Sequence, residues 1–387
     1  MAYLDCNAST PMAPAVKQKM ANAFDLYANP NGMHSNSKQA EGLFESARGS
    51  IATSLNVRES EVIFTSGSTE AITLAIWGVL LAAPASRSKV LVSSIEHTAI
   101  IETARAACKI AGKELILIPA NTSDSSLLGE VDVDFIQTYL DSETALIAVM
   151  AVNNETGVIQ PIELISQLAS EFNIPFLCDS TQAIGKWEHF LSLEERGIFM
   201  VSGHKIYGPK GVGILVLPRV LQKNFFSIAP GGGQERGIRG GTLNLAGAIG
   251  MATALEFVNT DLEQELGRQK TLGDRLFANL MSVFGENLRL NVGTSARVIK
   301  NTLNLQFVGT QADAVLASLR FVQASRASAC TAGFEEPSHV LIAMGKTWIE
   351  AEESIRLSLG RYTVEKDIDV ATRDLIAAVT RVREFNE

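Results

Sequence analysis

Short apolar runs rich in Val, Ile and Leu recur between about residues 60 and 217 of the chain, and segments with helical spacing separate them. The runs are EVIFTSG, KVLVSSIEH, ELILIPA, ALIAVMAVNNETG, IPFLCDSTQ, IFMVSGHK and GVGILVLP. Strands that are apolar on both faces and alternate with helices are typical of a mostly parallel sheet that helices cover on each side. The pattern therefore predicts an α/β domain.

The pattern also predicts a helix before the first run and a second structural unit after the last. Leu43, Ala47, Ile51 and Leu55 recur at every fourth position, which places an apolar stripe along one helix. The alternation of predicted strands and helices stops at the glycine-rich stretch APGGGQERGIRGGTLN. A long helical segment follows over about 245–283. Beyond it, NTLNLQF and ESIRLSLGR have the pattern of strands, and DIDVATRDLIAAVTRVREF has that of a closing amphipathic helix.

Composition and charge exclude several classes of protein. Of the 387 residues, 46% are hydrophobic and 19% charged, which is typical of a globular protein large enough for two domains. The net charge is −9 and Lys and Arg do not cluster, so we expect no direct contact with nucleic acid. The chain shows no signal-peptide pattern and no apolar segment of the roughly 20 residues that span a bilayer, so the cytoplasm is the expected location. Four scattered cysteines fit neither a disulfide framework nor a CxxC metal motif.

Polar residues directly follow the predicted strands, where ligands bind in sheets of this kind. The strand ends carry Thr65-Ser66-Gly67-Ser68-Thr69, Glu96-His97, Asn153-Asn154-Glu155, Asp179-Ser180-Thr181-Gln182 and Ser202-Gly203-His204-Lys205. The first end opens a helix, whose free N–H groups, with the hydroxyls of Ser68 and Thr69, suit a phosphate. Helix capping is the alternative for these hydroxyls. The capping interpretation is less favoured because Ser202 and His204 supply further hydrogen-bond donors from another strand end.

Asp179 and Lys205 narrow the kind of ligand. A carboxylate directly after an apolar strand needs donors or a cation, so Asp179 is either a capping residue or the partner of a protonated heterocyclic nitrogen. Lys205 either extends its amine to solvent or uses a lowered pKa to attack a carbonyl. An amine, a carboxylate and a phosphate cup together suit pyridoxal 5′-phosphate (PLP).

Several ordered motifs extend over nearly the whole chain. They are YLDCNASTP, NPNGMHS, FTSGSTEA, EHTAI, VNNETGVIQPI, CDSTQAIGK, SGHKIYGPKGVG, RGGTLN, RASACTAGFEEPSHVL and SIRLSLGRYT. Together they resemble the cysteine desulfurases of the class V aminotransferase group, which have the PLP-dependent transferase fold type I. The resemblance implies a large domain with a mostly parallel seven-stranded sheet between helices, and a smaller α+β domain. An N-terminal segment, 1–14, would pack with the small domain, and the large PLP-binding and small domains would span 15–258 and 259–387.

The resemblance also implies roles for the polar strand ends. Lys205 would bind the aldehyde of PLP, Asp179 would pair with the pyridine nitrogen, and His97 would stack on the ring and assist proton transfer. Gln182 and Asn154 would contact the ring-oxygen side. The phosphate would be held by the backbone of Ser68, the side chains of Thr69, Ser202 and His204, and Thr242 of the neighbouring subunit, which implies a homodimer with shared sites.

Arg356 would bind the carboxylate of the substrate, L-cysteine, together with Asn154. The alternation of Ile355, Leu357 and Leu359 with polar residues independently places Arg356 on the polar face of a strand. Planar bidentate pairing suits a guanidinium to a carboxylate, and a structural salt bridge is the alternative.

In the family that the chain resembles, the cysteine at the position of Cys330 determines the type of reaction. It lies among small and polar residues in SRASACTAG, whereas the sequence around Cys108 and Cys178 predicts buried thiols that act as small hydrophobes. Cys330 would accept the sulfur of the substrate as a persulfide, and alanine would remain. Many members of the group have glycine where this chain has Ala327, beside Arg326. Arg326 is therefore a candidate either to lower the pKa of the thiol or to contact an acceptor protein.

Two other functions stay open. A selenocysteine lyase, or another class V aminotransferase or lyase, would use the same fold without needing Cys330. A partner-activated sulfur-delivery scaffold would turn over slowly until an acceptor protein binds. The acceptor is not identified, because iron–sulfur assembly, tRNA thiolation and DNA phosphorothioation all use enzymes of this group. The acidic chain predicts that sulfur reaches nucleic acid only through another protein.

Overall fold

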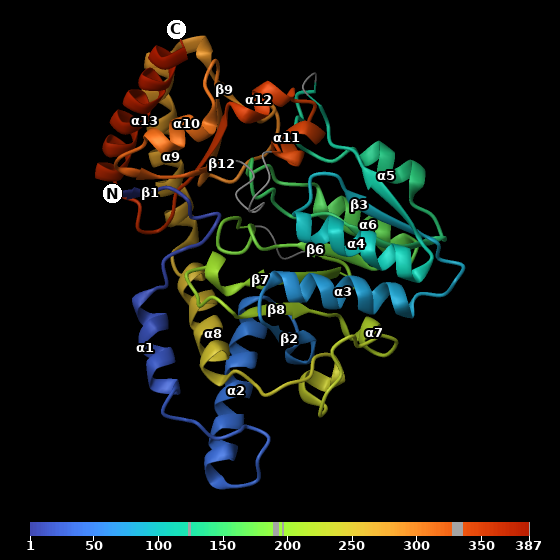
Figure 1. The fold of residues 1–387 in the computed structure, drawn as a ribbon. Helices are drawn as coiled ribbons and strands as arrows, with labels where there is room; N and C mark the ends of the chain where they lie inside the picture. The colour runs from blue at the N-terminus through green and yellow to red at the C-terminus, as the bar shows by residue number, and fades with distance from the viewer. Residues whose placement is uncertain (123–124, 189–192, 196, 327–335, 387) are drawn as a thin grey trace.

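A seven-stranded sheet forms the centre of the larger unit (Figure 1). The computed structural model describes residues 1–122, 125–188, 193–195, 197–326 and 336–386. The strands are β2 (Val62–Thr65), β3 (Lys89–Ser93), β4 (Glu114–Ile118), β5 (Thr144–Ala148), β6 (Phe176–Asp179), β7 (Gly197–Ser202) and β8 (Gly213–Val216). Their order is β2-β8-β7-β6-β5-β3-β4, and β8 runs antiparallel to both its neighbours. The mostly parallel sheet predicted from the apolar runs is confirmed.

Alternating side chains give this sheet two apolar faces, as strands buried on both sides require. One face packs against α3 (Ser68–Ala82) and α4 (Thr98–Ala111). The other packs against α2 (Ser35–Ser54), α6 (Ile162–Glu171) and α8 (Leu245–Asn259). The remaining helices of this unit are α1 (Pro14–Ala23), which lies on α8, α5 (Val133–Tyr139), which contacts α6, and the short α7 (Arg219–Gln222).

The apolar stripe of α2 differs by one position from the prediction. Leu43 is exposed, whereas Ala40, Phe44, Ala47 and Ile51 are buried. A spacing of four residues rotates about 40° past one full turn at each step, so a strict four-residue repeat leaves the buried face. Alternating steps of three and four residues keep the buried residues on it.

The helical segment predicted over 245–283 consists of two helices, α8 and α9 (Leu262–Phe284). Thr260 ends the first helix with an extended conformation (φ −68°, ψ 124°), and Asp261, which precedes the second helix, has a φ of 52° in the left-handed region. α8 packs on the large sheet, and α9 belongs to the smaller unit.

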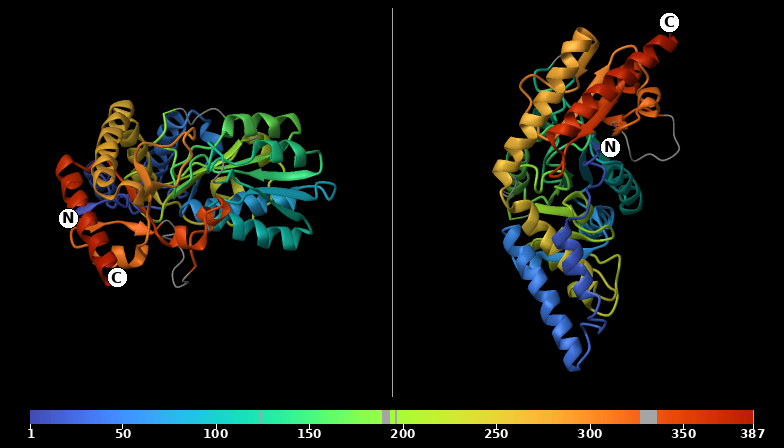
Figure 2. Two further views of the ribbon diagram at one scale, coloured as in Figure 1. Left: turned by 90° about the horizontal axis from the view of Figure 1, so that it is seen from above. Right: turned by 90° about the vertical axis from the view of Figure 1, so that its left-hand side faces the viewer.

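The smaller unit contains a four-stranded antiparallel sheet in the order β12 (Ser325–Arg326), β13 (Ser354–Ser358), β10 (Thr302–Phe307) and β9 (Leu288–Leu290). α9, α10 (Ala312–Ser318) and α13 (Glu365–Asn386) build its core, and α9 and α13 lie side by side (Figures 1 and 2). Two short helices, α11 (His339–Ala343) and α12 (Trp348–Glu352), precede β13. Near the N-terminus, β1 (Ala2–Tyr3) pairs with β11 (Val322–Gln323), so the first residues join this unit. Within the described ranges, no helix has the length and apolar character that crossing a membrane requires.

The connection between β7 and β8 determines where Lys205 lies. Residues 203–212 join the two strands, and a parallel crossover needs a dozen residues or more, so β8 turns back along β7. The connection begins with a 3₁₀ turn, Gly203–Lys205, directly after the buried strand β7. Lys205 therefore lies at the carboxyl edge of β7, the edge where the parallel strands β3, β5 and β6 also end.

Candidate active site

A cavity of about 600 Å³ lies at this carboxyl edge of the sheet. Its lining includes many of the residues predicted from the sequence, namely Ser68, Thr69, His97, Asn154, Asp179, Gln182, Ser202, His204, Lys205 and Arg356. Most of them follow separate strands of the large sheet, and Arg356 comes from β13 of the smaller unit. The fold therefore brings the polar strand ends together in one place.

The start of α3 forms one end of the cavity. Gly67, which precedes the first helical residue Ser68, has a φ of 156°, a conformation that favours glycine. A Cβ atom on Gly213 of β8 would lie 2.6 Å from the Cα atom of Gly67, so the loop can approach the strand this closely because Gly213 has no side chain. The Oγ atom of Ser68 lies 2.7 Å from Oγ1 of Thr181. Hydroxyls beside the free N–H groups of a helix start are the donors that a phosphate requires.

His204 lines the cavity as an uncharged imidazole at neutral pH. Burial, followed by the positive charges of three lysines nearby, lowers the pKa of His204 to about 4. Its Nδ1 atom lies 3.2 Å from the Oγ atom of Ser9. A neutral imidazole retains one N–H donor, so His204 can still donate a hydrogen bond to an anion.

Asp179 and Glu96 are two buried acids at neighbouring strand ends. Asp179 ends β6, and its Oδ1 atom accepts the N–H of Thr181 at 2.9 Å. Glu96 accepts the N–H of Met150 through Oε1, and its Oε2 atom has no hydrogen-bond partner among the described residues. Burial, with the charge of Asp179 as the second cause, raises the pKa of Glu96 well above its usual value. The raised pKa favours the neutral form of Glu96.

His97 and Lys205 line the cavity from two further strand ends. The Nδ1 atom of His97 accepts the N–H of Ala99 at 3.1 Å and caps α4, so the proton of a neutral ring is on Nε2. The Nζ atom of Lys205 donates to the backbone oxygens of Asn7 at 2.7 Å and Ala8 at 2.8 Å. The N-terminal residues are thus part of the site, which the sequence analysis did not predict. The available signal was the run NAST, which follows β1 after Leu4, Asp5 and Cys6 and carries small polar residues like the other strand ends.

Arg356 approaches the cavity from the smaller unit. Its side chain is 3% exposed, with Nη2 at 2.8 Å from Oδ1 of Asp5 and Nη1 donating to the backbone oxygen of Asn154 at 3.1 Å. In the described part of the chain, Nε of Arg356 and Oδ1 of Asn154 are buried without a hydrogen-bond partner. Such atoms are rare in folded proteins and favour a polar ligand. The salt bridge considered as the alternative for Arg356 is present, and it leaves Nε free of protein partners among these residues.

Two of the predicted site residues are not placed in this cavity. Thr242 is exposed and does not line it, and its predicted role depends on a neighbouring subunit. Cys330 lies outside the described residues, as does Ala327. Arg326, the last described residue before them, forms an ion pair with Asp313 at 2.5 Å. The roles of Thr242, Cys330 and Arg326 remain predictions.

The other three cysteines are buried. Burial is the first cause that raises the pKa of Cys6 to about 12 and that of Cys108 to about 11. It also raises the pKa of Cys178 in β6 well above its usual value. All three are therefore protonated thiols at neutral pH, which fits small hydrophobic residues better than nucleophiles.

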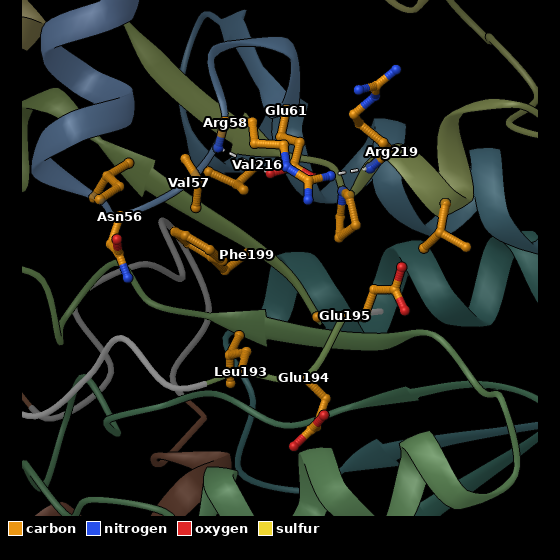
Figure 3. Close-up of a pocket in the computed structure, with 14 residues that line it drawn as sticks. Asn56, Val57, Arg58, Glu61, Leu193, Glu194, Glu195, Phe199, Val216 and Arg219 are labelled. Carbon is orange, nitrogen blue, oxygen red and sulfur yellow. Dashed lines mark hydrogen bonds between the residues drawn. The ribbon is translucent and has the colours of Figure 1, made fainter.

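A second cavity, of about 520 Å³, lies at the opposite ends of β7 and β8 (Figure 3). The backbone N–H groups of Arg58 and Arg219 donate to the carboxylate of Glu61 there, at 3.1 and 3.2 Å. Its described lining residues include no Lys, His, Ser or Cys. The chemistry expected from the sequence is therefore at the first cavity.

The first cavity fits PLP. It offers the Lys205 amine for an aldehyde, the Asp179 carboxylate for a protonated ring nitrogen, and the start of α3 for a phosphate. Its volume is in the range of cavities that bind small molecules. The unpartnered Nε atom of Arg356 suits the carboxylate of an amino acid.

Comparisons with known proteins agree with this arrangement. The family model described as "Aminotransferase class-V" matches residues 2–370. The chain is 39% identical, over 396 residues, to a cysteine desulfurase of Frankia sp. (strain EuIK1), with 100% of this chain and 93% of that protein covered. A solved NifS-like protein superposes with a TM-score of 0.85 at 29% identity, covering 100% of this chain and 99% of that one. SspA, solved in complex with cysteine, superposes with a TM-score of 0.80 at 30% identity, covering 94% and 100%.

Proposed function

The chain belongs to the aminotransferase class-V family and is a cysteine desulfurase of that family, and from this premise we propose that it transfers the sulfur of L-cysteine to Cys330 and releases L-alanine. The observation that carries the proposal is the meeting of Lys205, Asp179 and Arg356 in one cavity. These side chains supply an amine for the cofactor, a carboxylate for its ring nitrogen and a cation for the amino-acid carboxylate.

Dependence on PLP is a general property of this family. The side chains around the cavity would hold the cofactor at three points. Lys205 would bind its aldehyde, Asp179 its ring nitrogen, and the start of α3 its phosphate. His97, Asn154, Gln182, Ser202 and His204 would contact the ring and the phosphate, as predicted from the sequence. When bound, the cofactor withdraws electrons from the Cα–H bond of the amino acid.

Arg356 would orient the substrate. Its two Nη atoms already donate to Asp5 and Asn154, and burial makes the Nε–H costly to leave unsatisfied. A substrate carboxylate would accept from Nε and from one Nη atom in a bidentate pair. Replacement of Arg356 by Lys would remove the planar pair and raise KM more than it lowers kcat.

Lys205 would also move the proton. Its Nζ atom donates to the carbonyls of Asn7 and Ala8, which orient the amine. In the proposed reaction, Nζ takes the proton from Cα of the substrate. The Nε2 atom of His97 would assist proton transfer on the other side of the ring.

Cys330 would accept the sulfur. Its thiolate attacks the substrate sulfur, an S–S bond forms and the Cβ–S bond breaks, and the electron pair of that bond stays with the carbon skeleton. Protonation of the skeleton gives alanine, so one sulfur atom moves and no external oxidant or reductant is needed. The buried, protonated thiols of Cys6, Cys108 and Cys178 support the choice of Cys330, since the nucleophile must be a thiolate.

Three further parts of the proposal concern the surroundings of the enzyme. A homodimer would let Thr242 of each subunit reach the phosphate in the neighbouring one, which is consistent with the exposed position of Thr242. A separate acceptor protein would receive the sulfur from Cys330. The reaction would take place in the cytoplasm.

The test compares purified wild type with Cys330→Ala in the presence of L-cysteine and excess dithiothreitol. Wild type is expected to release alanine and sulfide in equal amounts. Cys330→Ala is expected to keep the yellow colour of the bound cofactor and to lose product formation by a factor of about 100 or more, because the sulfur acceptor is gone. Cys108→Ala serves as the matched control and is expected to match wild type.

Product formation by Cys330→Ala at the wild-type rate would contradict the proposal and favour a lyase or a transaminase. Activity of the wild type only after an acceptor protein is added would instead favour the partner-activated scaffold. Lys205→Ala separates cofactor binding from sulfur transfer, because it is expected to lose the yellow colour as well as both products.

A further inference from the structure

A carboxylate lies at the helix start that would hold the phosphate of the cofactor. Glu70, in the first turn of α3, lines the cavity together with Ser68 and Thr69. Its Oε2 atom accepts the backbone N–H of Ser66 at 2.5 Å, so it holds the loop that precedes the helix. A phosphate monoester carries more than one negative charge at neutral pH. An uncompensated carboxylate at this position would therefore oppose the binding of a phosphate.

Arg239 compensates this carboxylate from the glycine-rich segment 229–241. Its Nε atom lies 2.7 Å from Oε1 of Glu70 and its Nη2 atom 3.5 Å from Oε2, so two nitrogens of the guanidinium face the carboxylate. Burial opposes the charge of Glu70, but the hydrogen bonds from Arg239 and Ser66 outweigh burial and lower its pKa. Arg239 is not among the described residues that line the cavity, so it is placed to act on a phosphate through Glu70.

The backbone around Arg239 is held in place by two further contacts. Ala229 pairs with Arg239 in an isolated β-bridge. Earlier in the segment, the carboxylate of Glu235 accepts hydrogen bonds of 2.8 and 3.0 Å from Arg48 of α2, and these two side chains are 1% and 4% exposed. An ion pair at a mobile surface loses much of its strength to the entropy of ordering its side chains. The pair of Arg239 and Glu70 is formed on a segment that is already ordered, which reduces this loss.

We propose that Arg239 is a positioning residue of the phosphate site, which compensates the charge of Glu70 so that this carboxylate holds the N–H of Ser66 without repelling the phosphate of PLP. The inference rests on the proposed function for the binding of that phosphate at the start of α3. It assigns a role to a side chain that lies behind the cavity lining.

The experiment compares the affinities of cofactor-free variants for PLP and for pyridoxal, which has the same ring and aldehyde but no phosphate. Both ligands are titrated by absorbance. Arg239→Gln leaves Glu70 uncompensated, so its affinity for PLP is expected to fall by about tenfold, because like charges repel at a partly buried site. Its affinity for pyridoxal is expected to change much less. Arg239→Lys keeps the charge and is expected to lose less PLP affinity than Arg239→Gln.

A double variant separates an effect through Glu70 from a direct effect of Arg239. Glu70→Gln removes the charge and keeps an oxygen for the N–H of Ser66, so it is expected to bind PLP at least as tightly as wild type. Addition of Arg239→Gln to Glu70→Gln is expected to change PLP affinity by no more than about threefold, because the carboxylate that Arg239 compensates is gone.

Arg105→Gln is the matched control. Arg105 forms an ion pair with Glu102 in α4, and neither residue lines the cavity. The replacement changes the net charge of the protein as Arg239→Gln does, and it is expected to leave both affinities unchanged. Melting temperatures of the cofactor-free proteins are recorded in parallel. If Arg239→Gln does not fold, Arg239→Met, which keeps the aliphatic part of the side chain, provides the same comparison.

Unchanged PLP affinity in Arg239→Gln would overturn the inference. Equal losses of PLP and pyridoxal affinity would do the same, because the charge of the phosphate would then be irrelevant. A double variant as weak as Arg239→Gln would also overturn it, since Arg239 would then act on the phosphate directly or on the fold.

The proposed function is tested separately by the release of alanine from wild type. Release of alanine without a loss specific to PLP refutes the role of Arg239 alone. A loss specific to PLP without release of alanine refutes desulfuration alone.

Discussion

At the residue scale, the neutral acid Glu96 makes stability depend on pH. Its carboxyl is fully buried and its pKa is raised well above the value of 4.5 that it has in an unfolded chain, mainly by burial. As pH rises above that value, the unfolded chain releases the proton and the folded protein keeps it. Wild type therefore loses stability toward high pH, by up to about 1.4 kcal/mol for each pH unit until the folded pKa is reached.

Glu96→Gln cannot ionise and is expected to remove this part of the pH dependence. Urea midpoints of the cofactor-free protein, measured between pH 5 and 8, should favour the variant increasingly as pH rises. Glu171→Gln makes the same chemical change at an exposed position. Its urea midpoints should depend on pH in the same way as those of wild type. A constant difference between Glu96→Gln and wild type over this range would mean that Glu96 is already ionised in the folded protein.

Residues such as Asp179 and Lys205 could be predicted from the sequence because each directly follows an apolar strand. Asn7 and Lys186 could not be predicted in the same way. Asn7 reaches the site from the N-terminal segment, 198 positions before its partner Lys205. Lys186 lies in a turn after β6, and it contacts the same distant residue, Asn7. Local patterns show where a strand ends, but they do not show which remote segment covers it.

At the scale of elements, the contact of the α3 loop with β8 is expected to control phosphate binding. Gly213→Ala adds a Cβ atom 2.6 Å from the Cα atom of Gly67, so the loop must shift away from the strand. The loss of about one well-aligned hydrogen bond should weaken PLP binding by about tenfold. Equilibrium titration of the cofactor-free protein by absorbance measures this change.

Gly267→Ala is the matched control. It lies inside α9, where an added Cβ atom meets nothing within 4 Å. It should leave the affinity unchanged and raise stability by about 0.5–1 kcal/mol, because alanine favours a helix. PLP affinity in Gly213→Ala equal to that of wild type would show that the loop does not hold the phosphate.

The strands of the large sheet were largely predictable, since each of them forms within one of the apolar runs. The antiparallel direction of β8 depends on a short connection that apolar periodicity does not reveal. The division of the segment over 245–283 was also missed, because the extended Thr260 and the left-handed Asp261 separate α8 from α9, and hydrophobic periodicity does not record backbone conformation. Periodicity therefore identifies elements more reliably than their ends and directions.

At the scale of the whole molecule, the N-terminal segment joins the two units around the cavity. The Nδ2 atom of Asn7 donates to Oγ1 of Thr302 in β10 at 2.9 Å, and its Oδ1 atom accepts from Asn301 and Lys186. One side chain thus connects the smaller sheet with the turn after β6. All four groups are buried, so water does not readily replace the hydrogen bonds of Asn7, although Asn301, Thr302 and Lys186 each keep one other partner.

Asn7→Ala is therefore expected to destabilise the protein by about 0.5–1.5 kcal/mol for each hydrogen bond that is lost. The effect should be uneven, because the hydrogen bonds lost on the smaller unit lie at β10. Backbone hydrogen exchange should accelerate in β10 and β13 and change little in α3 and α4, which pack on the far face of the large sheet. Asn22→Ala, at an exposed position of α1, controls for the loss of an amide and should leave exchange unaltered. Equal acceleration of exchange in both units would show that they unfold together and that Asn7 does not link them. Acceleration confined to β10 and β13 would identify the Asn7 side chain as the link that holds Arg356 in position relative to the rest of the site.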